Sequence, residues 1–152
     1  MDHAAVIRAA WNDPANAARY RAVPADVVIG QAMLETGNFT STIFRENRNA
    51  FGMKLPASRP TLATGENRGH AVYNSVADSV RDYVLRQRNF GIPDTGNVST
   101  YMRETVGSGY ATDPDYLRKW AAQVLAVAPP GSLDHAAEIT AVMFLILLYA
   151  HR

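Results

Sequence analysis

An apolar run that ends in a carboxylate is the strongest constraint on this chain. Residues 27–34 are largely apolar, Glu35 follows them, and Gly37 comes two positions later. Pro24 suits the first turn of a helix and Gly37 suits a left-handed stop, so the run predicts one helix between these two residues. At 3.6 residues per turn, positions 28, 31, 32 and 35 share one face, which places Glu35 on an apolar stripe.

This position favours the neutral form of Glu35. Desolvation by apolar neighbours and the negative end of the helix dipole both raise the pKa of a carboxyl group. A carboxylic acid that stays protonated near neutral pH is what a general acid requires. The alternative is a glutamate in the last helical turn that is solvated or paired with a nearby arginine. The sequence therefore makes Glu35 a candidate general acid.

Four blocks stand in order along the chain, and the first of them carries Glu35. They are Gln31–Gly37, Asn49–Lys54, Tyr73–Tyr83 and Gly109–Tyr116. Over residues 24 to about 125, this series resembles the glucosaminidase domain of bacterial and phage peptidoglycan hydrolases, glycoside hydrolase family 73. The resemblance implies a mostly α-helical, lysozyme-like domain with a small β-hairpin lobe. It also implies a glycosidase that acts on peptidoglycan.

The same resemblance extends the candidate catalytic set. Glycoside cleavage generally uses one acid for the leaving oxygen and a second group for the oxocarbenium-like centre. Family members carry a second glutamate in the β lobe, and Glu66 is its counterpart here, with a solvated loop glutamate as the alternative. Tyr110 is similar to the family tyrosine that lines the cleft. Tyr116 is the next choice for a substrate-binding ring, with ordinary packing as an equal alternative.

Three residues of the second block are expected to support the cleft. Phe51 and Met53 would form its floor, and Asn49 would satisfy backbone groups behind the acid. Two positions depart from the family pattern, because Asn74 stands where aspartate is common and Ala50 where a second asparagine is common. The hairpin block is also short. These departures keep open a protein of another class, a wall-binding or virion assembly module with little activity.

Composition limits the function classes. With 152 residues, 47% hydrophobic and 19% charged, the chain predicts one folded domain over 1–152. A net charge of +1 does not argue for nucleic acid. There is no cysteine, and the four histidines, His3, His70, His135 and His151, lack metal-ligand spacing. We therefore expect no metal or other cofactor.

Periodicity and capping signals predict mostly helices. Helices are expected over 3–11, 15–22 and 24–37, from Ser75, after Asp113, and over about 132–150. A turn is expected over 42–47, and loop with a short hairpin over 55–72. Three arginines of the Ser75 helix are interpreted as a solvated face, namely Arg81, Arg86 and Arg88.

The last expected helix is apolar around its circumference from Ala141 to Ala150. It is either a central core helix or a contact for a second copy, a virion component or a membrane surface. Its apolar run over 139–150 is too short to span a bilayer. The N-terminal residues lack the basic and apolar regions of a secretory signal peptide, which suggests a phage-encoded lysin or a virion-associated protein that acts on the cell wall or in the periplasm.

The sequence thus predicts a hydrolase of peptidoglycan glycan strands. It would cleave the β-1,4 bond on the reducing side of N-acetylglucosamine, with Glu35 as the acid. The alternative enzyme is a lytic transglycosylase or muramidase, which would use a similar glutamate on the neighbouring bond.

Overall fold

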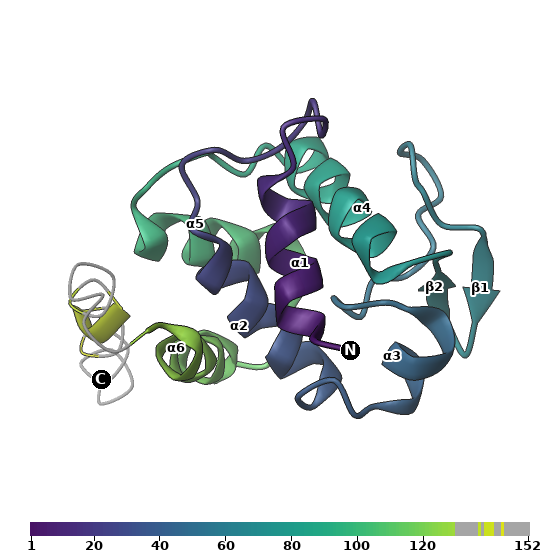
Figure 1. Ribbon diagram of the computed structural model, residues 1–152. Coiled ribbons are helices and arrows are strands. Elements are labelled where there is room, and N and C mark those ends of the chain that lie inside the picture. The colour runs from purple at the N-terminus through teal and green to yellow at the C-terminus, as the bar shows by residue number, and fades with distance from the viewer. Residues whose placement is uncertain (130–136, 138, 142–143, 145–152) are drawn as a thin grey trace.

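A computed structural model describes residues 1–129, 137, 139–141 and 144 of the chain. Helices make up most of the described part (Figure 1). They are α1 (His3–Asn12), α2 (Ala25–Thr36), α3 (Thr42–Asn47), α4 (Val76–Asn89), α5 (Val98–Thr105) and α6 (Tyr116–Val127), with one π-helical turn, η1 (Val106–Tyr110).

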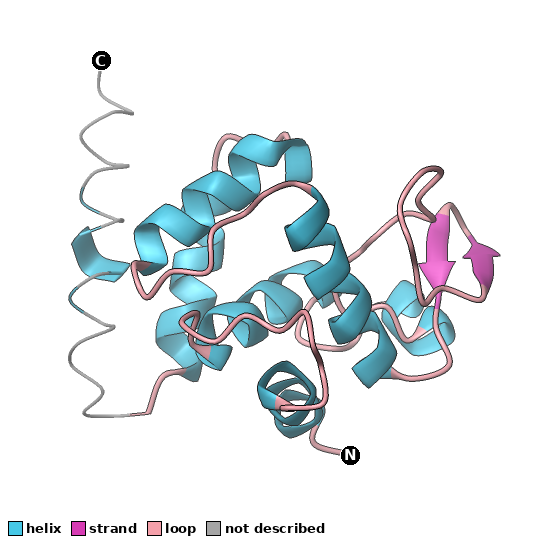
Figure 2. Ribbon diagram, turned by 90° about the horizontal axis from the view of Figure 1, so that it is seen from above, coloured by secondary structure: helices cyan, strands magenta, loops and turns pink. Residues whose placement is uncertain are grey.

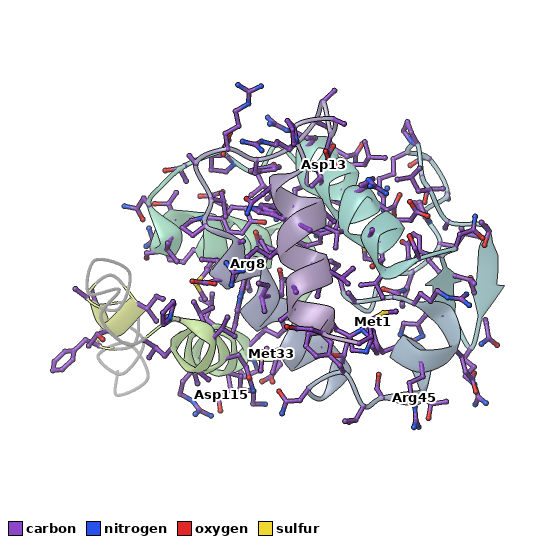
Figure 3. All side chains as sticks on the ribbon, in the orientation of Figure 1. Met1, Arg8, Asp13, Met33, Arg45 and Asp115 are labelled. Carbon is purple, nitrogen blue, oxygen red and sulfur yellow. The ribbon has the colours of Figure 1, made fainter. Side chains whose placement is uncertain are left out.

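Helix α2 carries the candidate acid and begins and ends as the sequence predicts. Pro24 precedes its first turn in an extended conformation, with ψ at 140°. Gly37 ends it in the left-handed region, with φ at 55°, and its N–H donates to the carbonyl of Met33. The helix packs against α1 and α6, and Arg8 of α1, labelled in Figure 3, forms an ion pair with Asp26 of α2.

The core between the helices is rich in large aromatic side chains. Trp11 and Trp120 are fully buried, and each indole N–H has a backbone acceptor. Trp11 donates to the carbonyl of Val23 at 3.0 Å, and Trp120 donates to the carbonyl of Val27 at 2.7 Å. Because both acceptors lie at the beginning of α2, these bonds fix that end of the helix against α1 and α6.

A two-stranded antiparallel sheet lies at one end of the molecule (Figure 2). Strands β1 (Gly65–Asn67) and β2 (His70–Val72) pair with Glu66 opposite Ala71. The buried side chain of Asn47 donates to the carbonyls of Asn67 and His70, at 3.0 and 3.3 Å, and so attaches the hairpin to α3.

The loop that leads into the hairpin is attached to α4 by a buried ion pair. Asp82 bonds Arg59 at 2.9 Å, accepts the hydroxyl of Tyr73 at 2.8 Å and accepts the N–H of Leu62 at 2.8 Å. Removing either charged partner would leave the other buried without a counter-charge.

The expected helix over 15–22 is wrong, because that segment forms turns and irregular backbone. Its polar backbone groups are bonded by distant side chains. Asp94 accepts the N–H groups of Arg21 and Ala22, and Arg88 donates to the carbonyls of Ala18 and Arg19. Tertiary partners therefore replace the helical hydrogen bonds that alanine propensity favours.

The apolar helix expected over about 132–150 lies mostly outside the described residues. Within it Ile139 is fully buried, whereas Phe144 is 66% exposed. Among the described residues, no helix has the length and hydropathy to cross a membrane.

Candidate functional site

A cavity of about 450 Å³ lies at the end of α2, and we call it the acid cavity. Residues from α2, α4, the segment after α3 and the segment around the end of η1 line it. They are Glu35, Phe51, Gly52, Met53, Lys54, Arg86, Gly109, Tyr110, Ala111 and Thr112. A second cavity of about 560 Å³ lies between α1, α3 and the start of α4, where Met1 and Arg45 line it (Figure 3), but no carboxylate does. The chemistry of an acid therefore belongs to the first.

Glu35 lies in the last turn of α2 and is half-buried. Its Oε1 accepts a hydrogen bond from the hydroxyl of Tyr116, at the start of α6. Burial is the largest influence on its pKa and raises it, whereas the hydrogen bond from Tyr116 and a coulombic interaction with His70 lower it by less. The net pKa of Glu35 is raised, which is the direction that the sequence predicts.

Tyr116 belongs to a chain of buried side-chain hydrogen bonds that begins at Glu35. The amide of Gln31 donates to the Tyr116 hydroxyl at 3.1 Å, and the carbonyl oxygen of Gln31 accepts the Tyr83 hydroxyl at 2.6 Å. The chain continues through Tyr101 and Gln87 to the guanidinium of Arg86, with separations of 2.9, 2.9 and 2.7 Å. Because this network is buried and bonded in sequence, it fixes the Tyr116 hydroxyl toward Glu35.

Tyr110 contributes a wall of the acid cavity. Its hydroxyl donates to the carbonyl of Phe51, and the guanidinium of Arg86 lies 4.7 Å from its ring centre. The preceding residue, Gly109, has φ at 84°, a left-handed conformation that interrupts the helical backbone of η1 just before Tyr110. Burial raises the pKa of Tyr110 well above its usual range, so its phenol is a neutral donor.

The second sequence block contributes residues to the acid cavity. Phe51 and Met53 line it, and Asn49 is buried behind them. The amide of Asn49 donates to the carbonyls of Met53 and Ala71, at 2.8 and 3.0 Å, and its oxygen accepts the N–H of Met53 at 3.1 Å. Asn49 thus closes the loop that carries the floor of the cavity.

Gly52, between the floor residues, was not singled out by the sequence reasoning. Its φ is 61°, and a Cβ atom there would lie 3.0 Å from Oε2 of Glu35. The left-handed φ favours glycine at this position, and a side chain there would also press on the carboxyl group of Glu35.

Glu66 does not join this arrangement. It is exposed on β1, opposite Ala71, and is not among the residues that line the acid cavity. Ala71 of β2 donates its N–H to the carbonyl of Met53 at 2.9 Å, so β2 lies between the cavity floor and β1. His70 of β2 does act electrostatically on Glu35, although the sequence marks it only as a histidine without metal-ligand spacing.

Arg86 was misassigned from the sequence. The interpretation of Arg81, Arg86 and Arg88 as a solvated face is wrong for Arg86, which is 8% exposed and lines the acid cavity. The signal was present in the spacing of α4, where polar residues recur at helical intervals with the aromatic core, at Ser79, Asp82, Tyr83, Arg86 and Gln87.

Comparison with known proteins identifies a family and a fold. The model of the glucosaminidase family, described as mannosyl-glycoprotein endo-β-N-acetylglucosaminidase, matches residues 12–126. Peptidoglycan hydrolase FlgJ of Pseudomonas aeruginosa is 34% identical over 122 residues, which cover 65% of this chain and 30% of that protein. The chain spans less than two thirds of the length of the curated relatives it matches, with shares of 23%, 30% and 39%.

Two solved structures resemble the molecule. A peptidoglycan hydrolase from Sphingomonas sp. A1 has a TM-score of 0.60 at 23% identity, covering 94% of each chain. A chain in a type VI secretion system effector–immunity complex from Pseudomonas protegens has a TM-score of 0.64 at 23% identity, covering 82% of this chain and 88% of that one. At this identity the likeness establishes the fold, and the predicted lysozyme-like helical domain with a small β lobe is confirmed.

Proposed function

This chain belongs to the glucosaminidase family, and we propose that it hydrolyses the glycan strands of peptidoglycan. The bond cut is the β-1,4 bond on the reducing side of N-acetylglucosamine, and the place of action is the cell wall. The family match supports a glycosidase, and the similarity to FlgJ supports peptidoglycan as the substrate.

The single observation that carries the proposal is the state of Glu35. Its carboxyl lines the acid cavity, its pKa is raised by burial, and one of its oxygens is held by the Tyr116 hydroxyl. A carboxylic acid in this state donates its proton to the glycosidic oxygen as the bond from that oxygen to the anomeric carbon breaks. Water then adds to the oxocarbenium-like carbon, and its proton is released to a base.

The second catalytic group that we propose is Glu66. It stabilises or attacks the anomeric carbon, or takes the proton from the attacking water. Tyr110 packs its ring on a sugar and presents its hydroxyl near the reacting centre, while Tyr116, Asn49, Phe51 and Met53 shape the binding surface. Phe51, Met53 and Tyr110 line the acid cavity, Tyr116 is bonded to Glu35, and Asn49 holds the loop behind the cavity. The sugar-binding role of Tyr110 and the catalytic role of Glu66 rest on the family resemblance.

A lytic transglycosylase is the second candidate, and one observation favours it. Among the described residues that line the acid cavity, Glu35 is the sole carboxylate. In that reaction one acid suffices, because the 6-hydroxyl of the muramic sugar replaces water and gives a 1,6-anhydro end.

Product analysis on purified peptidoglycan separates the candidates. The proposal expects new reducing ends on N-acetylglucosamine, detected by reductive labelling and mass analysis of the released fragments. It expects the Glu35→Gln protein to release these products about 100-fold more slowly, or slower still. Anhydromuramic ends would assign the transglycosylase reaction, and reducing ends on muramic acid would assign a muramidase. Wall binding with no soluble product would assign a binding module.

A further inference from the structure

Arg86 is a buried cation that forms no ion pair with any residue the structure describes. Its Nη1 donates to the side-chain oxygen of Gln87 and its Nη2 to the hydroxyl of Ser108, each at 2.7 Å. The guanidinium lies over the rings of Phe90 and Tyr110, at 4.3 and 4.7 Å from their centres. Within the described part of the chain, no carboxylate lies at ion-pair distance from it.

Two carboxylates on the helices that form this region have other partners. Asp82, one turn earlier on α4, is bonded to Arg59 at 2.9 Å. Glu35 lines the same cavity as Arg86, but its hydrogen bond comes from Tyr116 and its raised pKa favours the neutral form. Lys54 adds a second basic side chain to the lining. The acid cavity therefore has a positive electrostatic character.

A charge in this position is costly unless an anion joins it. Burying a guanidinium without a counter-ion costs several kcal/mol, and an apolar side chain could hold the Tyr110 ring without that cost. A guanidinium has five N–H donors, and its contacts with Gln87 and Ser108 use only two of them. The remaining donors match the planar, bidentate geometry of a carboxylate.

We propose that Arg86 binds a carboxylate of the saccharide substrate in the acid cavity, so that the site selects carboxylate-bearing glycan over neutral glycan. The inference rests on the proposed function for the identity of the saccharide. Peptidoglycan offers this chemistry from two sources, the lactyl group of muramic acid where the peptide has been removed and the stem peptide where it remains. Chitin oligosaccharides share the β-1,4 backbone of N-acetylglucosamine and lack both.

Binding to the full chain tests the selection without turnover. In a Glu35→Gln background, calorimetry compares chitotetraose with the peptidoglycan tetrasaccharide, prepared once with its stem peptides and once with them removed. We expect at least one carboxylate-bearing tetrasaccharide to bind about tenfold more tightly than chitotetraose, as a charged hydrogen-bonded pair supplies. Arg86→Met should abolish this ratio, and Arg86→Lys should restore part of it. Which tetrasaccharide is preferred identifies the carboxylate.

Arg88→Met is the matched control. Arg88 lies on the same helix, also stacks on a tyrosine, with its guanidinium 4.5 Å from the ring centre of Tyr20, and does not line the acid cavity. It should leave the ratio unchanged. Thermal melting and near-ultraviolet circular dichroism establish that both methionine variants are folded.

A second arm needs no Arg86 variant. Methyl esterification of the ligand carboxylates should reduce binding to the level of chitotetraose. Two results would overturn the inference and leave Arg86 as a support for Tyr110. One is equal affinity for the carboxylate-bearing tetrasaccharides and chitotetraose in the Glu35→Gln protein that retains Arg86. The other is an affinity ratio that persists after Arg86→Met. Failure of the proposed function is a separate result, seen as the absence of glycan cleavage by the wild-type protein. The ratio of the two affinities can still be measured in that case, because binding requires no turnover.

Discussion

Gly30 of α2 lies so close to Val124 of α6 that a Cβ atom at Gly30 would be 2.7 Å from the backbone nitrogen of Val124. Because backbone cannot move aside as a flexible side chain does, Gly30→Ala should separate the two helices. We expect a loss of about 1 to 3 kcal/mol in the free energy of unfolding, measured by urea denaturation.

Gly65→Ala is the control for that prediction. A Cβ atom at Gly65 meets nothing within 4 Å, and Gly65 lies in β1, away from the helix contact. A Gly30→Ala protein as stable as the Gly65→Ala protein would show that α2 and α6 tolerate a wider spacing.

Glu35→Gln should lower activity and raise stability. Turnover should fall about 100-fold or more, as for a lost general acid. Because burial raises the pKa of Glu35, the native state binds its proton more tightly than the unfolded state does, and ionisation at higher pH costs stability. The melting temperature of Glu35→Gln should therefore exceed that of the wild type above the raised pKa, and the difference should vanish below the ordinary carboxyl pKa.

Glu104→Gln provides the charge-matched control, since Glu104 is exposed on α5. It should leave turnover unchanged. An equal stability gain in both variants would assign the effect to net charge and not to burial at the cavity.

Local signals predicted the backbone around Glu35 well. Pro24 and Gly37 mark the ends of α2 because each acts within one helical turn, and Ser75 caps α4 in the same way, accepting the N–H of Asp78. The failure over 15–22 has the opposite cause, since Asp94 and Arg88, more than sixty residues along the chain, bond that backbone. Helix α5 was not predicted at all.

The acid cavity was predicted only in part for the same reason. The block 49–54 was singled out because it resembles a family block, and within it Asn49 bonds Met53 only four residues away. Arg86 and His70 become significant only when α4 and the hairpin meet the end of α2, which no short window of sequence contains. The signal that could have revealed Arg86 was the set of polar residues on the buried face of α4. Arg86 was instead interpreted as solvated because of its charge alone.

Tyr116→Phe should move the pH dependence of activity. The Tyr116 hydroxyl donates to the charged form of Glu35 and so lowers its pKa, although by less than burial raises it. Without the hydroxyl the pKa of Glu35 rises further. The alkaline limb of the pH profile of kcat/KM, where the acid loses its proton, should therefore shift to higher pH.

Tyr20→Phe is the matched control for that shift. Tyr20 is buried and donates its hydroxyl to the carbonyl of Ile92 at 2.6 Å, outside the chain of bonds that reaches Glu35. It should lower stability by about 1 kcal/mol and leave the pH profile in place. An unchanged alkaline limb in Tyr116→Phe would mean that another group sets it.

Glu66→Gln tests whether an exposed hairpin carboxylate takes part in catalysis. Glu66 lies outside the acid cavity, so its action at the anomeric carbon beside Glu35 requires the hairpin and the bound glycan to come together. We expect turnover to fall about 100-fold with the fold intact. Glu46→Gln is the control, because Glu46 is also exposed and near the hairpin, bonded to Arg68 at 2.9 Å. Full activity in Glu66→Gln would remove Glu66 from the mechanism. The N-acetyl group of the substrate would then be the remaining nucleophile, and retention of anomeric configuration, followed by NMR of fresh products, would identify it.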